Sequence, residues 1–229
     1  MSTKKPAEPG RSAATGARKR RTDGERSRRA ILHAAAQLAT TRGLESLSIG
    51  ELASHIGMSK SGLYAHFKSK EELELATIET AVEIFQAEVL GPVLSAEPGV
   101  VRLRALTDGF LSHLERRVFP GGCFFAAVAA ELDTRPGKAR DRIMRVHTEW
   151  MGLIERCIRE AQGLGEIDPG LDAAQLAFEA DGMLVGANFG FVLFGDPKIL
   201  RRARIGIDRL LAGAAKPSAK PRARTANRG

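Results

Sequence analysis

The spacing of apolar side chains predicts helices along most of this 229-residue chain. Apolar residues recur three and four positions apart, as on one face of an α-helix, and no segment alternates like a half-buried strand. Gly and Pro interrupt the pattern and mark the turns. The expected fold class is all-α with about nine helices, near residues 25–42, 49–56, 60–67, 69–90, 100–117, 122–132, 136–162, 171–194 and 197–212.

Two short helices in the first part of the chain are joined by a tight turn. Ser48 and Glu51 have the spacing of a capping box, so they mark the start of the first of these helices. Gly57 permits the left-handed backbone that a three-residue turn requires. The arrangement predicts a helix-turn-helix. Its expected core consists of the apolar side chains on the inner faces, namely Ile31, Leu38, Leu52, Ile56, Leu63 and Phe67.

The second short helix would present its outer side to solvent, and the DNA major groove, about 12 Å wide, accepts one α-helix. Lys60 and Ser61 are the candidates for contacts with base edges, and Gly62 would let the backbone approach the duplex. An exposed Tyr or His in a helical protein is commonly just surface packing. Here the turn, the apolar stripes and the upstream basic arm agree on DNA binding. Candidates for phosphate contacts are Ser48, Tyr64, His66 and Lys70.

Charge is distributed unevenly along the chain. Residues 1–30 contain ten Lys or Arg and three acids, and residues 213–229 contain five basic residues and no acid. Residues 71–212 contain sixteen basic and twenty-two acidic residues, although the formal net charge of the chain is +8. Such a chain attracts a polyanion at its ends and repels it along the rest. Because residues 1–24 and 214–229 lack an apolar period, we expect both to be disordered basic arms, either bound to DNA or solvated.

One stretch resembles the N-terminal DNA-binding domain of the TetR family of bacterial transcriptional regulators: residues 28–73 read RRAILHAAAQLATTRGLESLSIGELASHIGMSKSGLYAHFKSKEEL. The resemblance implies an all-helical homodimer with its recognition helix at about residues 60–67. It also implies a DNA-binding domain at 25–70 and a larger ligand-binding and dimerisation domain at 71–213. The positions that match common DNA contacts of the family are Ser48, Ser59, Lys60, Ser61, Tyr64, His66 and Lys70.

The last two predicted helices are the expected dimer surface. Between residues 171 and 194, Phe178, Val185, Phe189 and other apolar residues recur at helical spacing with small residues between them. Two such helices from each subunit would form a four-helix bundle about a two-fold axis, which suits a palindromic DNA site. The alternative is an ordinary buried core helix.

An effector pocket would lie among the middle helices, where apolar residues mix with a few polar groups. His113, His147 and Asn188 stand out, because a polar group on an apolar face needs a partner. A core histidine with a satisfied hydrogen bond is the alternative for each. The full candidate set is Phe85, Phe110, His113, Leu114, Phe124, Phe125, Val128, His147, Trp150, Met151, Met183 and Asn188.

Other kinds of site find little support in the sequence. His113, Cys123 and His147 share no recognised metal-ligand spacing. No GxSxG, HExxH, GxGxxG or P-loop pattern occurs, and solvation at a helix end explains Glu131 and Asp133. We therefore expect no metal, no cofactor and no enzymatic activity.

The sequence also indicates the cellular compartment of the protein. Cys123 and Cys157 are expected to be reduced core thiols. The longest nearly uncharged run, residues 182–195, is shorter than the roughly 20 residues that span a bilayer. The basic N-terminus has no apolar segment behind it and does not resemble a secretory signal. A cytoplasmic protein without a transmembrane helix is expected.

These observations together predict a homodimeric transcriptional regulator, a repressor that leaves a palindromic operator when a small molecule binds its C-terminal domain. One alternative is a helix-turn-helix regulator whose C-terminal domain binds a protein or nothing. Another is a helical binding protein or enzyme with an incidental helix-turn-helix. Loss of operator affinity on ligand binding would exclude the first alternative. Binding to DNA would exclude the second.

Overall fold

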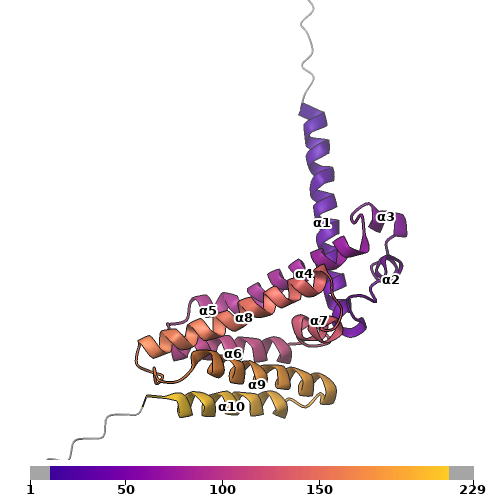
Figure 1. Cartoon of the computed structure of the whole chain (residues 1–229). Helices are drawn as coiled ribbons and strands as arrows, with labels where there is room; N and C mark the ends of the chain where they lie inside the picture. Colours follow the sequence, from indigo (N-terminus) through magenta and orange to yellow (C-terminus); the bar gives the residue numbers. More distant parts are fainter. Residues whose placement is uncertain (1–10, 217–229) are drawn as a thin grey trace, which may run out of the picture.

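The structure, a computed structural model, describes residues 11–216, with side chains from residue 23 onward. The helical elements in order are α1 (Arg11–Arg42), α2 (Ile49–His55), α3 (Lys60–Tyr64), α4 (Lys70–Phe85), the π-helix η1 (Gln86–Leu90), α5 (Gly91–Leu94), α6 (Val100–Glu115), α7 (Phe124–Leu132), α8 (Lys138–Gly163), α9 (Ala173–Phe194) and α10 (Lys198–Ala214). Because α4, η1 and α5 follow one another without a break, residues 11–216 form nine helical segments (Figure 1). The predicted all-α fold class is confirmed.

The first helix begins earlier than the sequence predicted. α1 starts at Arg11, so the prediction of a disordered arm was wrong for residues 11–24. Ala and Arg are frequent in this segment and are strong helix formers, and the packed turns that follow supply a nucleus for the helix. Residues 1–10 and 217–229, the rest of the two predicted arms, lie outside the described residues.

Serine side chains begin three consecutive helices. Ser48 accepts a hydrogen bond from the backbone N–H of Glu51, whose carboxylate returns to the Ser48 backbone, so the predicted capping box is present. Ser59 caps α3, and Ser69 caps α4 by accepting from the Glu72 N–H. These caps satisfy N–H groups that a helix start otherwise leaves unpaired, which fixes where each short helix begins.

The helix-turn-helix shares its apolar core with two helices from later in the chain. α7 contributes three side chains to this core and α8 contributes one, so the core crosses the boundary expected at residue 70. Ile56 is only partly buried, whereas the other predicted core residues are buried. Members of this core include Ile31, Leu38, Leu52, Leu63, Phe67, Phe124, Val128, Leu132 and Ile143.

The remaining helices form a second body that extends away from α2 and α3. α8 packs against α4, α6 and α9, and α9 packs against α10. In Figure 1, α9 and α10 lie side by side at the face farthest from α3, and α4 runs from the helix-turn-helix into this body. α4 therefore joins the two parts of the molecule directly.

α9 is apolar over more of its length than the nearly uncharged run of residues 182–195 indicated. Within residues 11–216 it is the one helix that meets the length and composition of a membrane span, with 22 residues. A core helix meets the same criteria, and α9 packs on α8 and α10. Its Asp181 accepts a hydrogen bond from the Trp150 indole N–H at 2.8 Å. This acid and Glu179 limited the apolar run that the sequence alone defined.

Candidate functional site

The turn between α2 and α3 has the geometry that the sequence predicted. Gly57 adopts a left-handed backbone with φ of 69°. The Met58 N–H then donates to the Ala53 carbonyl at 2.9 Å, which closes the turn over α2. Leu52 and Leu63 are fully buried between the helices. Packing of these inner faces holds α3 with its opposite face toward solvent.

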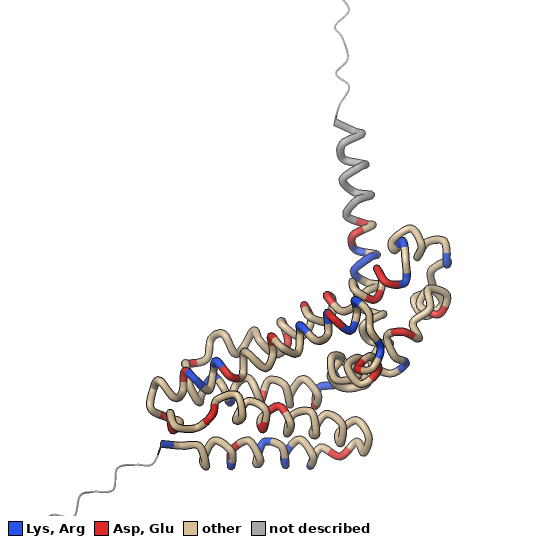
Figure 2. Tube along the Cα trace, in the orientation of Figure 1, with Lys and Arg blue, Asp and Glu red and all other residues tan. Residues whose placement is uncertain are grey.

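The predicted DNA contacts gather at this exposed edge. Tyr64 is 59% exposed although it is a large aromatic side chain. From residue 56 to residue 70 the chain contains three Lys and no acid, and Figure 2 shows this segment at the end of the molecule away from α9 and α10. Gly62 and His66 are half-buried. The exposed members are Ser48, Ser59, Lys60, Ser61, Tyr64 and Lys70.

Several of these side chains already have partners within the chain. The hydroxyls of Ser48 and Ser59 accept cap hydrogen bonds at 3.1 Å from the Glu51 and Gly62 N–H groups. The Lys70 ammonium donates to the Glu45 carbonyl and lies 3.6 Å from the Glu74 carboxylate. Contacts of these three side chains with a phosphate would share or replace the existing ones.

Lys60 is the exposed cation at the start of α3. It forms no ion pair with any of residues 23–216, and its methylene chain crosses the backbone of Gly50. A Cβ at Gly50 would lie 2.9 Å from the Lys60 Cε. The absence of a side chain at Gly50 therefore leaves room for Lys60 to lie along α2 beside the outer edge.

A cavity of about 410 Å³ lies among α4, η1, α5, α6, α7 and α8. Its inner wall includes three of the predicted pocket residues, Phe85, Phe125 and Trp150. Phe85 meets the rings of both others edge-on, with centroid distances of 5.6 Å to Phe125 and 5.5 Å to Trp150. This aromatic wall suits an apolar or flat ligand.

Polar groups lie at the exposed side of the cavity. Arg102 donates to Glu160 at 2.9 Å and to the carbonyl of Ala96. Arg156 also lines the cavity, and it has no ion-pair partner among residues 23–216. No local pattern indicated these residues, because they come from helices more than fifty positions apart in the chain. Lining residues absent from the predicted set are Val82, Gln86, Leu90, Val93, Leu94, Arg102, Val146, Glu149, Leu153, Arg156, Cys157 and Glu160.

Nine predicted pocket residues lie outside the cavity lining. His147 is exposed on α8, contrary to the expectation of a buried polar group. The Asn188 side chain accepts a hydrogen bond from the Cys123 N–H at 2.8 Å, so its partner is structural. Phe124 and Val128 belong to the core shared with the helix-turn-helix. The others outside the lining are Phe110, His113, Leu114, Met151 and Met183.

His113 lies behind the cavity wall. It is fully buried, its ring meets Phe85 edge-on at 5.6 Å, and neither ring nitrogen has a hydrogen-bond partner within residues 23–216. Burial, together with a smaller effect of the nearby Arg116 and against an opposing effect of Glu88, lowers the pKa of His113 to about 4. The imidazole is therefore neutral at neutral pH.

Both cysteines are free and buried, as predicted. Burial raises the pKa of the Cys123 thiol to about 11, and burial also raises the pKa of Cys157. Neither residue is a thiolate near neutral pH.

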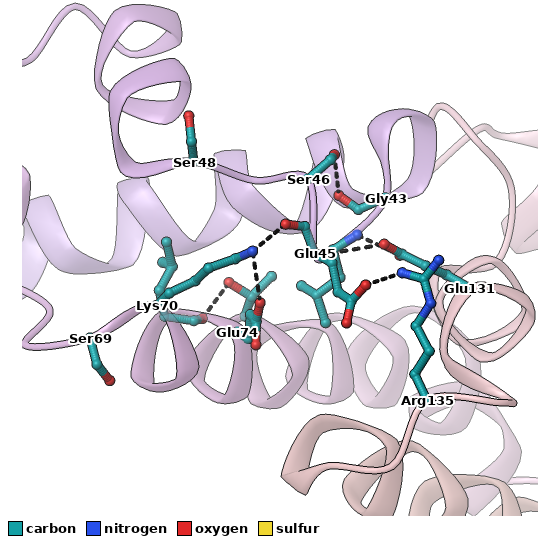
Figure 3. A network of polar contacts seen from close by, with 12 residues as sticks. Gly43, Glu45, Ser46, Ser48, Ser69, Lys70, Glu74, Glu131 and Arg135 are labelled. Atoms are coloured by element: carbon teal, nitrogen blue, oxygen red, sulfur yellow. Dashed lines mark hydrogen bonds and ion pairs between the residues drawn. The ribbon is translucent and has the colours of Figure 1, made fainter.

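Glu131 is bound within the structure, contrary to the expectation of a solvated acid. Its carboxylate accepts hydrogen bonds from the backbone N–H groups of Leu44 at 2.6 Å and Glu45 at 3.0 Å, in the connection between α1 and α2 (Figure 3). Arg135 pairs with the Glu45 carboxylate. Asp133, two residues from Glu131, is exposed as predicted.

Two family models match the chain in sequence. The model for bacterial regulatory proteins of the tetR family covers residues 31–77. The model for the C-terminal domain of tetracyclin repressor-like proteins covers residues 99–207. The matches cover the helix-turn-helix with the start of α4, and then α6 through most of α10.

Matches to individual proteins agree with the two family models. The chain is 30% identical over 136 residues to an uncharacterized HTH-type transcriptional regulator in the lacX 3′ region of Lactococcus lactis subsp. lactis, covering 58% of this chain and 69% of that protein. The crystal structure of a TetR transcriptional regulator from Chloroflexus aurantiacus matches with a TM-score of 0.80 and 26% identity, covering 86% of this chain and 100% of that one.

A further solved structure is that of AibR in complex with isovaleryl coenzyme A and operator DNA. It matches with a TM-score of 0.64 and 26% identity, covering 83% of this chain and 99% of that one. With an exposed recognition helix, a helical body and these relatives, the chain belongs to the TetR family of bacterial transcriptional regulators.

Proposed function

We propose that this protein is a homodimeric repressor that binds a palindromic operator and releases it when a small molecule occupies the cavity between α4 and α8. The observation that carries the proposal is the position of α4. Its first turn adjoins the helix-turn-helix, and its last residue, Phe85, lies in the cavity wall. Binding to DNA would place the protein in the cytoplasm.

The DNA-binding part of the proposal rests on α3. Lys60 and Ser61 would reach base edges, Tyr64 would contact the backbone, and the half-buried Gly62 would allow close approach. Ser48, Ser59, His66 and Lys70 flank this edge and are proposed as phosphate contacts. Because phosphate contacts release counterions, affinity should decrease steeply with salt.

The homodimer is proposed to form through α9 and α10. α9 exposes Phe178, Phe189 and Phe194 by 67%, 66% and 71%, respectively. Isolated exposed apolar residues are ordinary, but a row of them on one helix indicates a contact surface. A two-fold dimer on this surface would present two copies of α3 to two half-sites.

The effector is proposed to be a small molecule with an apolar body and a polar end. The aromatic wall would take the body, and Arg102, Arg156, Glu149 and Glu160 line the region that would meet the end. The AibR complex, which holds both isovaleryl coenzyme A and operator DNA, supports binding of a small molecule as well as DNA by a protein of this fold. A coupling of about 1–3 kcal/mol would change operator affinity about 5- to 150-fold.

DNA binding is tested by fluorescence anisotropy with the DNA that flanks the protein's own gene. We expect Tyr64→Ala and Lys60→Ala to weaken binding, and Lys60→Ala to reduce the slope of log affinity against log salt by about 1. Arg145→Ala, at an exposed position on α8 outside the proposed DNA and dimer surfaces, is the matched control and should bind like the native protein. Absence of binding, or equal affinity of all four proteins, would refute the DNA interface.

The effector response is tested by a thermal-shift screen of small molecules. A ligand that binds the folded dimer raises its melting temperature. Molecules that do so should displace the flanking DNA in the same anisotropy assay. Ligands that stabilise the protein and leave DNA affinity unchanged would favour a regulator without this response.

A further inference from the structure

α7 contacts both the cavity and the helix-turn-helix. Phe125 lies in the cavity wall, and the adjacent Phe124 is fully buried in the core that holds α1 to α4. Val128 and Leu132 continue this buried face one and two turns later. α7 is nine residues long and packs against both α1 and α8. A displacement at Phe125 would therefore move side chains inside the helix-turn-helix core.

Glu131 adds a polar connection at the far end of the same helix. Its two carboxylate oxygens take one backbone N–H each, from Leu44 and Glu45. Hydrogen bonds to an ionised acceptor are stronger than neutral ones. The two N–H groups lie in the connection between α1 and α2, four and three residues before the Ser48 cap, so the carboxylate helps to fix where α2 begins.

The backbone around this contact is specialised to admit the carboxylate. Gly43 ends α1 with φ of 87°, in the left-handed region. A Cβ at this position would lie 2.7 Å from a Glu131 carboxylate oxygen. The glycine thus serves two purposes at once, because it turns the chain and leaves space for the acid.

Neighbouring contacts hold the same two segments together. The Gln37 side chain donates to the Val118 carbonyl at 2.9 Å, and the Gly121 N–H donates to the Thr40 hydroxyl at 3.0 Å. All of them join the end of α1 to α7 or to the chain that leads into it. The end of α1 is therefore bound to the effector side of the molecule independently of α4.

We infer that Glu131 is a positioning residue through which α7 transmits occupancy of the cavity to the helix-turn-helix, as a second route beside α4. This inference rests on the proposed function. When a ligand displaces Phe125, α7 moves as a short rigid helix and carries the Leu44 and Glu45 amides with it. The start of α2, and with it the outer edge of α3, then changes position against the DNA.

Glu131→Gln is the variant that tests this inference with the least change in shape. The amide keeps one oxygen acceptor and places its NH₂ against the second backbone N–H, so one hydrogen bond is lost. Asp133→Asn is the matched control, because it removes the same charge from an exposed position at the end of the same helix. Circular dichroism and melting temperatures establish that each variant is folded.

Occupancy of the cavity can be imitated without a known effector. Leu153→Trp introduces an indole from a lining position of α8 into the cavity of about 410 Å³. Val146→Trp, two turns earlier on α8 and also in the lining, is the second filling variant in case the first does not fold. Operator affinity is measured by anisotropy for each filling variant alone, with Glu131→Gln and with Asp133→Asn.

In the otherwise native protein, we expect the filling residue to weaken operator binding within the range of about 5- to 150-fold typical of allosteric coupling. With Glu131→Gln the loss should be at least about threefold smaller, because the α7 route is then broken while the α4 route remains. With Asp133→Asn it should remain as in the native background. Hydrogen exchange at the Leu44 and Glu45 amides should accelerate on filling in the native background.

Two other results would contradict the inference in different ways. A filling residue that weakens binding equally with and without Glu131→Gln would overturn the α7 route and leave the proposed repressor intact. Filling variants that are folded, occupy the cavity and bind the operator as tightly as the native protein would overturn the proposed effector response, and the α7 route with it.

Discussion

The imidazole of His113 is buried without a hydrogen bond to any of residues 23–216, so folding removes two polar nitrogens from water without replacing their partners. An unsatisfied buried polar group costs about 1–3 kcal/mol. The side chain instead packs edge-on against Phe85 and Phe119, at 5.6 and 5.5 Å. The unpaired nitrogens therefore lower the stability of the fold, and the aromatic contacts offset part of this cost.

The lowered pKa of His113 predicts an acid-sensitive stability. The unfolded imidazole binds a proton below pH 6.5, whereas the folded one binds it only below about pH 4. Protons therefore favour the unfolded state in this window, and stability falls as the pH decreases through it. Between pH 6.5 and pH 5 the loss should be about 2 kcal/mol. Urea unfolding at a series of pH values measures it.

His113→Leu is the control for this titration. It removes both unsatisfied nitrogens, so the variant should be more stable than the native protein at pH 7 by about 1 kcal/mol. Its free energy of unfolding should also decrease less than that of the native protein between pH 6.5 and pH 5, because the titrating imidazole is absent. Parallel pH profiles for the two proteins would contradict the buried neutral histidine.

At the scale of single elements, Arg28 connects three helices around the recognition helix. From α1, its guanidinium lies 4.5 Å from the centre of the Phe67 ring and donates to the His66 carbonyl at 3.0 Å. It also lies 3.8 Å from the Glu72 carboxylate in the first turn of α4. These contacts hold the chain that leaves α3 against α1 and α4.

Arg28→Ala should destabilise this arrangement. Loss of the cation–π contact and of a charged hydrogen bond predicts a decrease of about 2 kcal/mol in the free energy of unfolding. Arg29→Ala removes the same charge from an exposed position on α1 and should leave stability nearly unchanged. Chemical denaturation of both variants measures the difference, and equal effects would show that Arg28 acts only through its charge.

The helices whose signals are local were predictable from the sequence. The Ser48 capping box, the Gly57 turn and the apolar spacing located α2 and α3, and the exposed edge followed because its residues are close together in the chain. The π-helix η1 was not predictable, because the expected helix continued to about residue 90 without a local signal for a change in hydrogen bonding. η1 brings Gln86 and Leu90 to the cavity.

The cavity was only partly predictable for a related reason. Phe85, Phe125 and Trp150 were expected because aromatic residues in middle helices commonly line pockets. Packing between distant helices decides which face of each helix meets the cavity, and Arg102 with Glu160 pairs across 58 positions. Apolar spacing identifies a buried face, but it does not distinguish a cavity wall from a filled core, as Phe124 demonstrates.

On the scale of the whole molecule, the two apolar cores do not coincide with a simple division of the chain. One core combines the helix-turn-helix with α7 and Ile143, and the other joins η1, α6, α8, α9 and α10. Charge follows a different division, since residues 71–212 are acidic overall while the first thirty are basic. DNA would thus be attracted to the basic N-terminal segment and repelled by the acidic excess of the residues that follow the helix-turn-helix.

The exposed apolar row on α9 lies at the end of the molecule away from α3, outside both the proposed DNA surface and the cavity. Phe189→Asp would place a carboxylate in the centre of the proposed two-fold contact, where burial of an unpaired charge is costly. We expect the dimer dissociation constant to rise at least about 30-fold, because central aromatic residues commonly contribute about 2 kcal/mol or more. Sedimentation velocity across a concentration series measures it.

Met144→Asp is the matched control, since Met144 is an apolar residue on α8 that is 52% exposed. It should leave the dimer intact. A monomeric Phe189→Asp variant should also bind the flanking DNA more weakly, because each α3 would then contact its half-site without the second. The opposite result, a dimeric Phe189→Asp variant and a monomeric Met144→Asp variant, would contradict the proposed dimer. The subunits would then meet through α8, and a different two-fold axis would set the distance between the two recognition helices.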